Sequence, residues 1–189
     1  MTHPPPDIRD TDVPQATCRW AQHMLDTYAS ETNKVASVWR AWPDADLAYR
    51  PHPRSSSVVD VMKHQLLSER RFFAEFLGLP EPAAPDVLPN DLRMAAMVAR
   101  LTELARARLS HLAMRPESWW LESAPFFDVT RQRIWIFWRR VLHTAHHRTQ
   151  LTVYLRLLDR PVPSTYGPTA DVTWSGADPT TSVASAGRG

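Results

Sequence analysis

Three histidines lie close together in one segment of the chain: His143, His146 and His147. In a helix, His143 and His147 would stand one turn apart on the same face, with Cβ atoms about 5–6 Å apart. Two neutral imidazole rings in that arrangement can share one metal ion, each through a nitrogen about 2.0–2.1 Å from zinc. The spacing therefore indicates metal binding, although a helix can also carry several histidines through composition alone.

His146 is a competing partner, since His143 and His146 also share a face of a helix. Helical phase favours His147, because His146 leans toward the stripe that holds Arg139. The stripe of His143 and His147 holds three further positions: Ile136, Gln150 and Tyr154. We therefore predict that His143 and His147 bind the ion and that His146 is a neighbouring group.

A tight site needs a third ligand from elsewhere in the chain. His3 lies near the chain start, His52 between two prolines and His111 near the end of an expected helix. His64 lies within another expected helix, one turn after Asp60, whose carboxylate could accept a hydrogen bond from a metal-bound ring. A single histidine in a helix is more often a hydrogen-bonded core or boundary residue, so His64 alone does not establish a site.

Apolar residues recur at helical spacing in four long segments that prolines separate. The first helix is expected from about residue 13 to residue 42, where Pro43 stops it. The second begins after Ser57, which with Asp60 fits the pattern of a helix-capping pair, and it ends at Gly78, a residue suited to a left-handed cap.

The third helix is expected to open at Pro89 or Asn90 and to end before Pro116. The loop that follows contains four large rings: Trp119, Trp120, Phe126 and Phe127. Thr130 is expected to cap the fourth helix, which runs from about residue 131 to residue 159. Without an alternating strand pattern, the chain is expected to be all-α, an antiparallel four-helix bundle with one or more long connections.

The composition is that of an ordinary globular protein. The 189 residues include 22 basic and 20 acidic ones, and this balance lacks the concentrated basic patch of a nucleic-acid-binding protein. Cys18 is the single cysteine, no apolar run approaches the ~18 residues of a membrane helix, and the first residues lack a secretory pattern. We expect a cytoplasmic protein that binds neither nucleic acid nor membranes.

The composition also divides the chain into three parts. Residues 1–12 are rich in proline and are expected to form a flexible arm. Residues 13–172 form the bundle domain. Residues 173–189 are rich in Gly, Ser, Thr and Ala and are expected to be a disordered tail.

Residues 49–64, 143–156 and 161–171 together resemble the DinB family of four-helix-bundle proteins, which includes YfiT-like proteins. The family order is a histidine in the second helix, an HxxxH pair in the fourth and a trailing Tyr-Gly-Pro segment. In that family these histidines bind a divalent metal, most often zinc or nickel. For this chain iron, copper and manganese stay open as alternatives, because the ligand type does not fix the metal. Carried onto this sequence, the ligands are His64, His143 and His147. Thr149 stands where the family pattern has glycine.

The resemblance implies a metal-dependent enzyme, either a thiol-dependent S-transferase or a hydrolase. Its partners would be a low-molecular-weight thiol or a small electrophile, and a homodimer formed along helices is also implied. Three neutral imidazoles leave a coordination position open, as in a catalytic site, where the ion lowers the pKa of a bound water or thiol. The alternative is a stress-related metal-binding bundle without turnover. In either case the affinity for metal is expected to fall as the pH drops through the histidine range near ~6.5.

Overall fold

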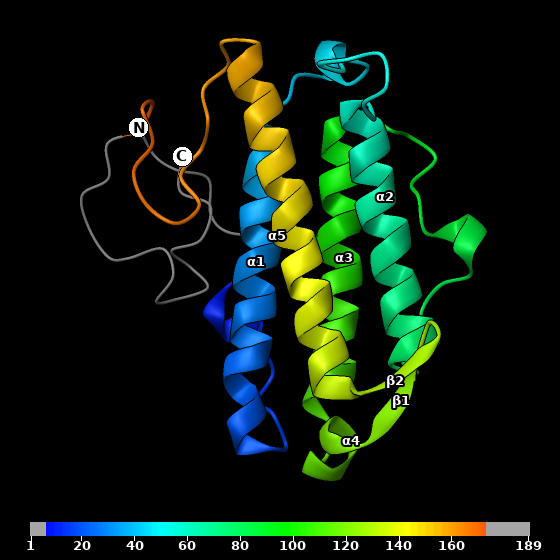
Figure 1. Cartoon of the computed structure of the whole chain (residues 1–189). Coiled ribbons are helices and arrows are strands. Elements are labelled where there is room, and N and C mark those ends of the chain that lie inside the picture. Colours follow the sequence, from blue (N-terminus) through cyan, green and yellow to red (C-terminus); the bar gives the residue numbers. More distant parts are fainter. Residues whose placement is uncertain (1–6, 173–189) are drawn as a thin grey trace.

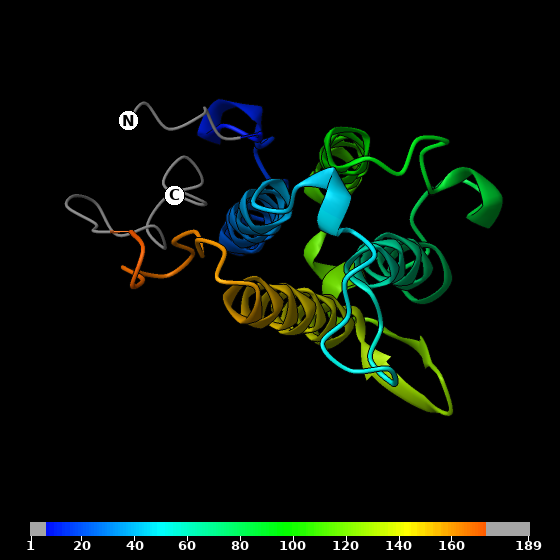
Figure 2. The same ribbon diagram turned by 90° about the horizontal axis from the view of Figure 1, so that it is seen from above.

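Four long helices dominate the computed structural model, which describes residues 7–172 (Figure 1). They are α1 (Gln22–Arg40), α2 (Val58–Arg71), α3 (Met94–Ala113) and α5 (Arg133–Leu157). Helices α1 and α5 run in one direction, and α2 and α3 run in the other (Figure 1). Seen from above, the helices stand at four corners, so that α1 with α3 and α2 with α5 are antiparallel neighbours (Figure 2). The predicted all-α four-helix bundle is confirmed.

Shorter elements fill the connections. They are the 3-10 turns η1 (Asp10–Asp12), η2 (Arg19–Ala21), η3 (Asp44–Asp46) and η5 (Ala84–Asp86), the π-helical turn η4 (Phe72–Phe76), the helix α4 (Glu117–Leu121) and the strands β1 (Ser123–Phe126) and β2 (Val129–Gln132). The two strands pair antiparallel, with Phe126 opposite Val129. The expectation of a plain aromatic loop without strands was therefore wrong, because this segment forms a short helix and a hairpin.

The ends of α2 match the sequence prediction at both capping residues. The Ser57 hydroxyl accepts a hydrogen bond from the Asp60 backbone N–H at 3.3 Å and donates one to the Asp60 carboxylate at 2.6 Å. At the other end, Gly78 adopts a left-handed φ of 67° beyond the π-helical turn. The Leu79 N–H donates to the Phe73 carbonyl at 2.8 Å, one residue further back than in the usual cap of this kind, because the preceding turn is π-helical.

Helix α3 begins at Met94, later than the predicted Pro89 or Asn90. The Met94 N–H donates to the Asp44 carboxylate at 2.7 Å, so a residue from the α1–α2 connection supplies the cap. A cap contributed by a distant loop cannot be recognised from the local pattern.

Helices α1 and α5 also begin later than predicted. Helix α1 starts at Gln22, whose side chain accepts a hydrogen bond from the Ala16 N–H at 2.8 Å. Helix α5 starts at Arg133, because Thr130, the predicted cap, is opposite Pro125 in the hairpin.

The first residues that the structure describes contact α1. Ile8 is fully buried, and its backbone exchanges two hydrogen bonds with the Asn33 side chain, at 3.0 and 2.8 Å. Within the expected flexible arm, Ile8 is therefore anchored on the bundle, whereas residues 9–12 are exposed. Residues 1–6 of that arm and the predicted tail 173–189 lie outside the described residues. Among the helices that the structure describes, none is both long and apolar enough to cross a membrane.

Candidate metal centre

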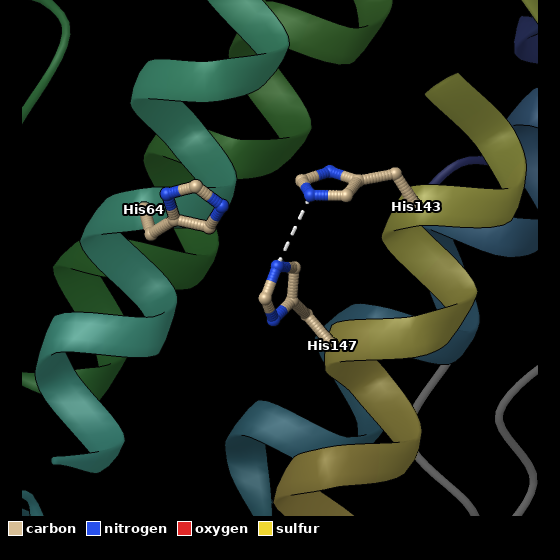
Figure 3. A group of neighbouring side chains, drawn as sticks. All are labelled: His64, His143 and His147. Carbon is tan, nitrogen blue, oxygen red and sulfur yellow. Dashed lines mark hydrogen bonds between the residues drawn. The ribbon is translucent and has the colours of Figure 1, made fainter. Parts of the chain in front are cut away.

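Helices α2 and α5 bring three histidine rings to one point (Figure 3). His64 comes from α2, and His143 and His147 come from successive turns of α5. One ring nitrogen from each residue lies within 4.8 Å of the other two, and the Nε2 atoms of His143 and His147 are 3.2 Å apart. The ring of His64 lies 5.3 Å from that of His143 and 4.7 Å from that of His147, between centroids.

These nitrogens fit a single divalent ion. Two nitrogens at 2.0–2.1 Å from zinc can be at most about 4.2 Å apart, so the His143–His147 pair already has the required spacing. The 4.8 Å limit for the group as a whole exceeds this spacing, so the exposed His64 ring must move closer to the pair for all three to hold one ion. Within the described residues, this is the one group of three or more histidine, cysteine or carboxylate side chains close enough to share an ion.

His143 is held by Arg140 and Phe72. Nη1 of Arg140 donates to Nδ1 of His143 at 2.7 Å, and the Phe72 ring lies parallel to the imidazole at 6.2 Å between centroids. Burial, and then the nearby guanidinium, lower the pKa of His143 to about 3. The ring is therefore neutral at physiological pH, which is the charge state that a metal-bound imidazole requires.

Arg140 is itself fully buried, at 1% exposure. Its guanidinium donates to the Ser68 hydroxyl at 2.8 Å and lies 3.8 Å from the Glu69 carboxylate. Glu69 also pairs with the buried Arg108 at 3.1 Å. This network ties α5 to α2 directly beside the histidines and fixes the cation at the rear of the site.

His147 has a different set of partners. Its Nδ1 lies 2.9 Å from Oε1 of Gln150, and Nε2 of Gln150 donates to the Tyr154 hydroxyl at 2.9 Å. The three residues lie on successive turns of the stripe identified in the sequence. Burial lowers the pKa of His147, although the hydrogen bond with Gln150 opposes that shift.

His146 lies outside the group. It is exposed, and its ring is 4.9 Å from that of His147 between centroids. It lines a shallow hollow of about 530 Å³ on the outer face of α5, together with Tyr166.

Asp60 does not serve His64 as the sequence analysis expected. Its carboxylate accepts hydrogen bonds from Ser57 at 2.6 Å and from Lys63 at 3.5 Å. The helix cap thus occupies the carboxylate, and this prediction was wrong. His52 and His111 are likewise not in the group.

A second polar cluster lies inside the bundle next to the turn of α5 that carries His147. The Glu31 carboxylate on α1 accepts hydrogen bonds from Arg148, from Lys34 at 2.7 Å and from the Tyr166 hydroxyl at 2.6 Å. Lys34 and Arg148 also lie over the Tyr166 ring, at 4.0 and 4.8 Å from its centroid. The Tyr-Gly-Pro segment therefore closes over α1 and α5. Neither this cluster nor Arg140 was anticipated from the sequence.

Comparison with known proteins agrees with the arrangement of these helices. The sequence profile of the DinB family matches residues 15–175. The chain belongs to the DinB family. No curated protein matches this DinB protein.

Two solved DinB-like structures share the fold. The first, from Bacillus cereus ATCC 10987, is 19% identical, with a TM-score of 0.60 over 72% of this chain and 91% of that one. The second, from Bacillus subtilis, is 20% identical, with a TM-score of 0.58 over 73% of this chain and 92% of that one. At this level of identity the similarity establishes the DinB-like fold.

Proposed function

We propose that this DinB protein is a metal-dependent enzyme that activates a low-molecular-weight thiol for transfer to a small electrophile. The observation that carries the proposal is the convergence of His64, His143 and His147 from two helices. Zinc or nickel is the expected ion, since imidazole ligands suit both. When bound, such an ion lowers the pKa of a thiol or water at its open position.

The protein's own residues support an anionic ligand at this position. All three histidines are neutral ligands, and the nearest buried charge is the Arg140 cation. Within the described residues no carboxylate joins the group, so nothing cancels the positive charge of a bound ion. A thiolate complements such a centre, and the exposed side of His64 leaves it a path from solvent.

Metal content and turnover test the proposal together. Protein purified without a histidine tag should contain a divalent metal and should accelerate conjugation of a low-molecular-weight thiol to a chromogenic electrophile. His64→Ala, His143→Ala and His147→Ala should each lose most of the bound metal and the activity. His146→Ala and His111→Ala are matched controls and should retain both.

Other outcomes would redirect the assignment. Metal-dependent ester hydrolysis without thiol transfer would make the protein a hydrolase. Bound metal with no turnover on either substrate panel would favour a non-catalytic, stress-related metal-binding bundle. Loss of metal from His146→Ala but not from His147→Ala would show that the ligand pair is wrong.

A further inference from the structure

A continuous hydrogen-bonded chain runs along α5 from Arg140 to Tyr154 through His143 and His147, two of the three proposed ligands. Arg140 contacts Nδ1 of His143, Nε2 of His143 contacts Nε2 of His147, and Nδ1 of His147 contacts Gln150. Figure 3 shows the central contact, between the two Nε2 atoms. A neutral imidazole has one N–H and one acceptor nitrogen, so each contact constrains the next.

The donor-only character of arginine fixes the direction of this chain. Because a guanidinium cannot accept a hydrogen bond, Nδ1 of His143 is the acceptor and its proton is on Nε2. That N–H donates to Nε2 of His147, which must then be unprotonated. The proton of His147 is therefore on Nδ1 and donates to the Gln150 carbonyl oxygen. The lowered pKa values of His143 and His147 agree with two neutral rings.

We propose that Gln150, held in place by Tyr154, is the positioning residue that fixes His147 with its Nε2 lone pair aimed at the metal position. Gln150 is anchored at both ends of its amide. Its oxygen accepts from His147, and its nitrogen donates to Tyr154, which is 6% exposed and packs against the Tyr49 ring at 6.1 Å. The amide therefore cannot rotate without breaking two hydrogen bonds.

His147 is thus already in the form a metal ligand needs, whereas His143 is not. Outer partners that set the tautomer and orientation of a ligating histidine typically contribute about 10–100-fold to metal affinity. The effect on metal binding rests on the proposed function, but the tautomer of His147 is a property of the metal-free protein. The two can therefore be tested separately.

The first experiment measures the tautomers in metal-free protein. Long-range ¹H–¹⁵N spectra of histidine-labelled protein, recorded above the ordinary histidine pKa, should show His147 with its proton on Nδ1 and His143 with its proton on Nε2. Gln150→Leu should shift His147 to a mixture of tautomers, and Thr149→Val, a neighbouring exposed position, should not. A wild-type His147 protonated on Nε2 would overturn the proposal, whether or not the protein binds metal.

The second experiment measures zinc affinity by competition with a chromogenic chelator. Gln150→Leu should weaken binding about 10–100-fold. Gln150→Glu keeps an acceptor and should retain wild-type affinity or exceed it, and Tyr154→Phe should weaken binding less than Gln150→Leu. Equal affinity of wild type and Gln150→Leu would refute the positioning role, and equal losses in the Leu and Glu variants would assign the effect to packing. A wild-type protein without affinity for zinc or nickel would instead refute the proposed function and leave the tautomer result standing.

Discussion

The carboxylate of Glu31 on α1 pairs with the guanidinium of Arg148 on α5, inside the bundle and one residue after His147. Both side chains are almost fully buried. The pair therefore fixes the rotation of α5 against α1 at the turn from which the second proposed ligand of the HxxxH pair projects toward α2.

Breaking this pair should destabilise the protein strongly. Glu31→Gln removes the carboxylate that Arg148 and Lys34 share and should lower the free energy of unfolding by about 3–5 kcal/mol. Arg148→Met should lower the free energy of unfolding by less, because Lys34 and Tyr166 continue to donate hydrogen bonds to Glu31. Urea denaturation of the two variants measures the difference. If Glu31→Gln lowered the free energy of unfolding by no more than a typical surface substitution does, a structural role for the cluster would be contradicted.

The partly buried ring of His143 should make the metal-free protein sensitive to acid. The pKa of His143 is lowered to about 3, because burial and the Arg140 guanidinium disfavour its charged form. In the unfolded chain a histidine has a pKa of about 6.5, so between these values the unfolded state binds more protons. Stability should therefore fall as the pH drops from about 6.5 toward 3.

Urea midpoints of the metal-free protein at about pH 7.5 and about pH 5 would measure this loss. His143→Gln lacks the buried ring and should lose less stability over the same interval. Identical losses of stability in the wild type and the variant would mean that His143 has the same pKa in the folded and unfolded states.

Zinc affinity should persist to a lower pH than the sequence alone suggests. The pKa values of His64, His143 and His147 are all lowered, in each case chiefly by burial. Since only a protonated ring is lost as a ligand, binding should hold at pH ~6.5 and fall at more acidic pH. A peptide carrying residues 140–150, with solvated rings, is the reference. Protein and peptide releasing zinc over the same pH interval would argue against this expectation.

The cap on α3 offers a test of the fold itself. Asp44→Ala removes the acceptor of the Met94 N–H and should lower the free energy of unfolding by about 1 kcal/mol. Asp128→Ala, in the exposed hairpin turn, should change it by less than about 0.5 kcal/mol. Thermal or urea unfolding distinguishes the two, and equal values would remove Asp44 from the helix cap.

The features that the sequence predicted correctly are local or periodic. The Ser57–Asp60 cap depends on residues three positions apart, and the four apolar stripes depend on helical period. Helical phase also separated His147 from His146, and the structure places the first beside His64 and the second on the outer face. Whether His64, His143 and His147 bind a metal stays a prediction.

The features that the sequence could not predict depend on tertiary contacts or unusual turns. Arginine is rarely buried, so nothing in the pattern marked Arg140 or Arg148 as interior residues. The hairpin has strands of four residues, and Phe127 at its turn takes a φ of 53° without the glycine or asparagine that normally announces such a turn. The Phe127 ring packs against the rings of Phe76 and Phe126, at 4.9 and 4.8 Å between centroids, and these contacts accompany the left-handed backbone.

The placement of one histidine on α2 and two on α5 has a mechanical consequence for the chain. An ion held by all three would cross-link segments that are far apart in sequence. Closing so long a loop reduces the conformational entropy of the unfolded chain. Separation of α2 from α5 would then require release of the ion, so local opening of that face of the bundle would be rarer in the metal-bound protein than in the metal-free one.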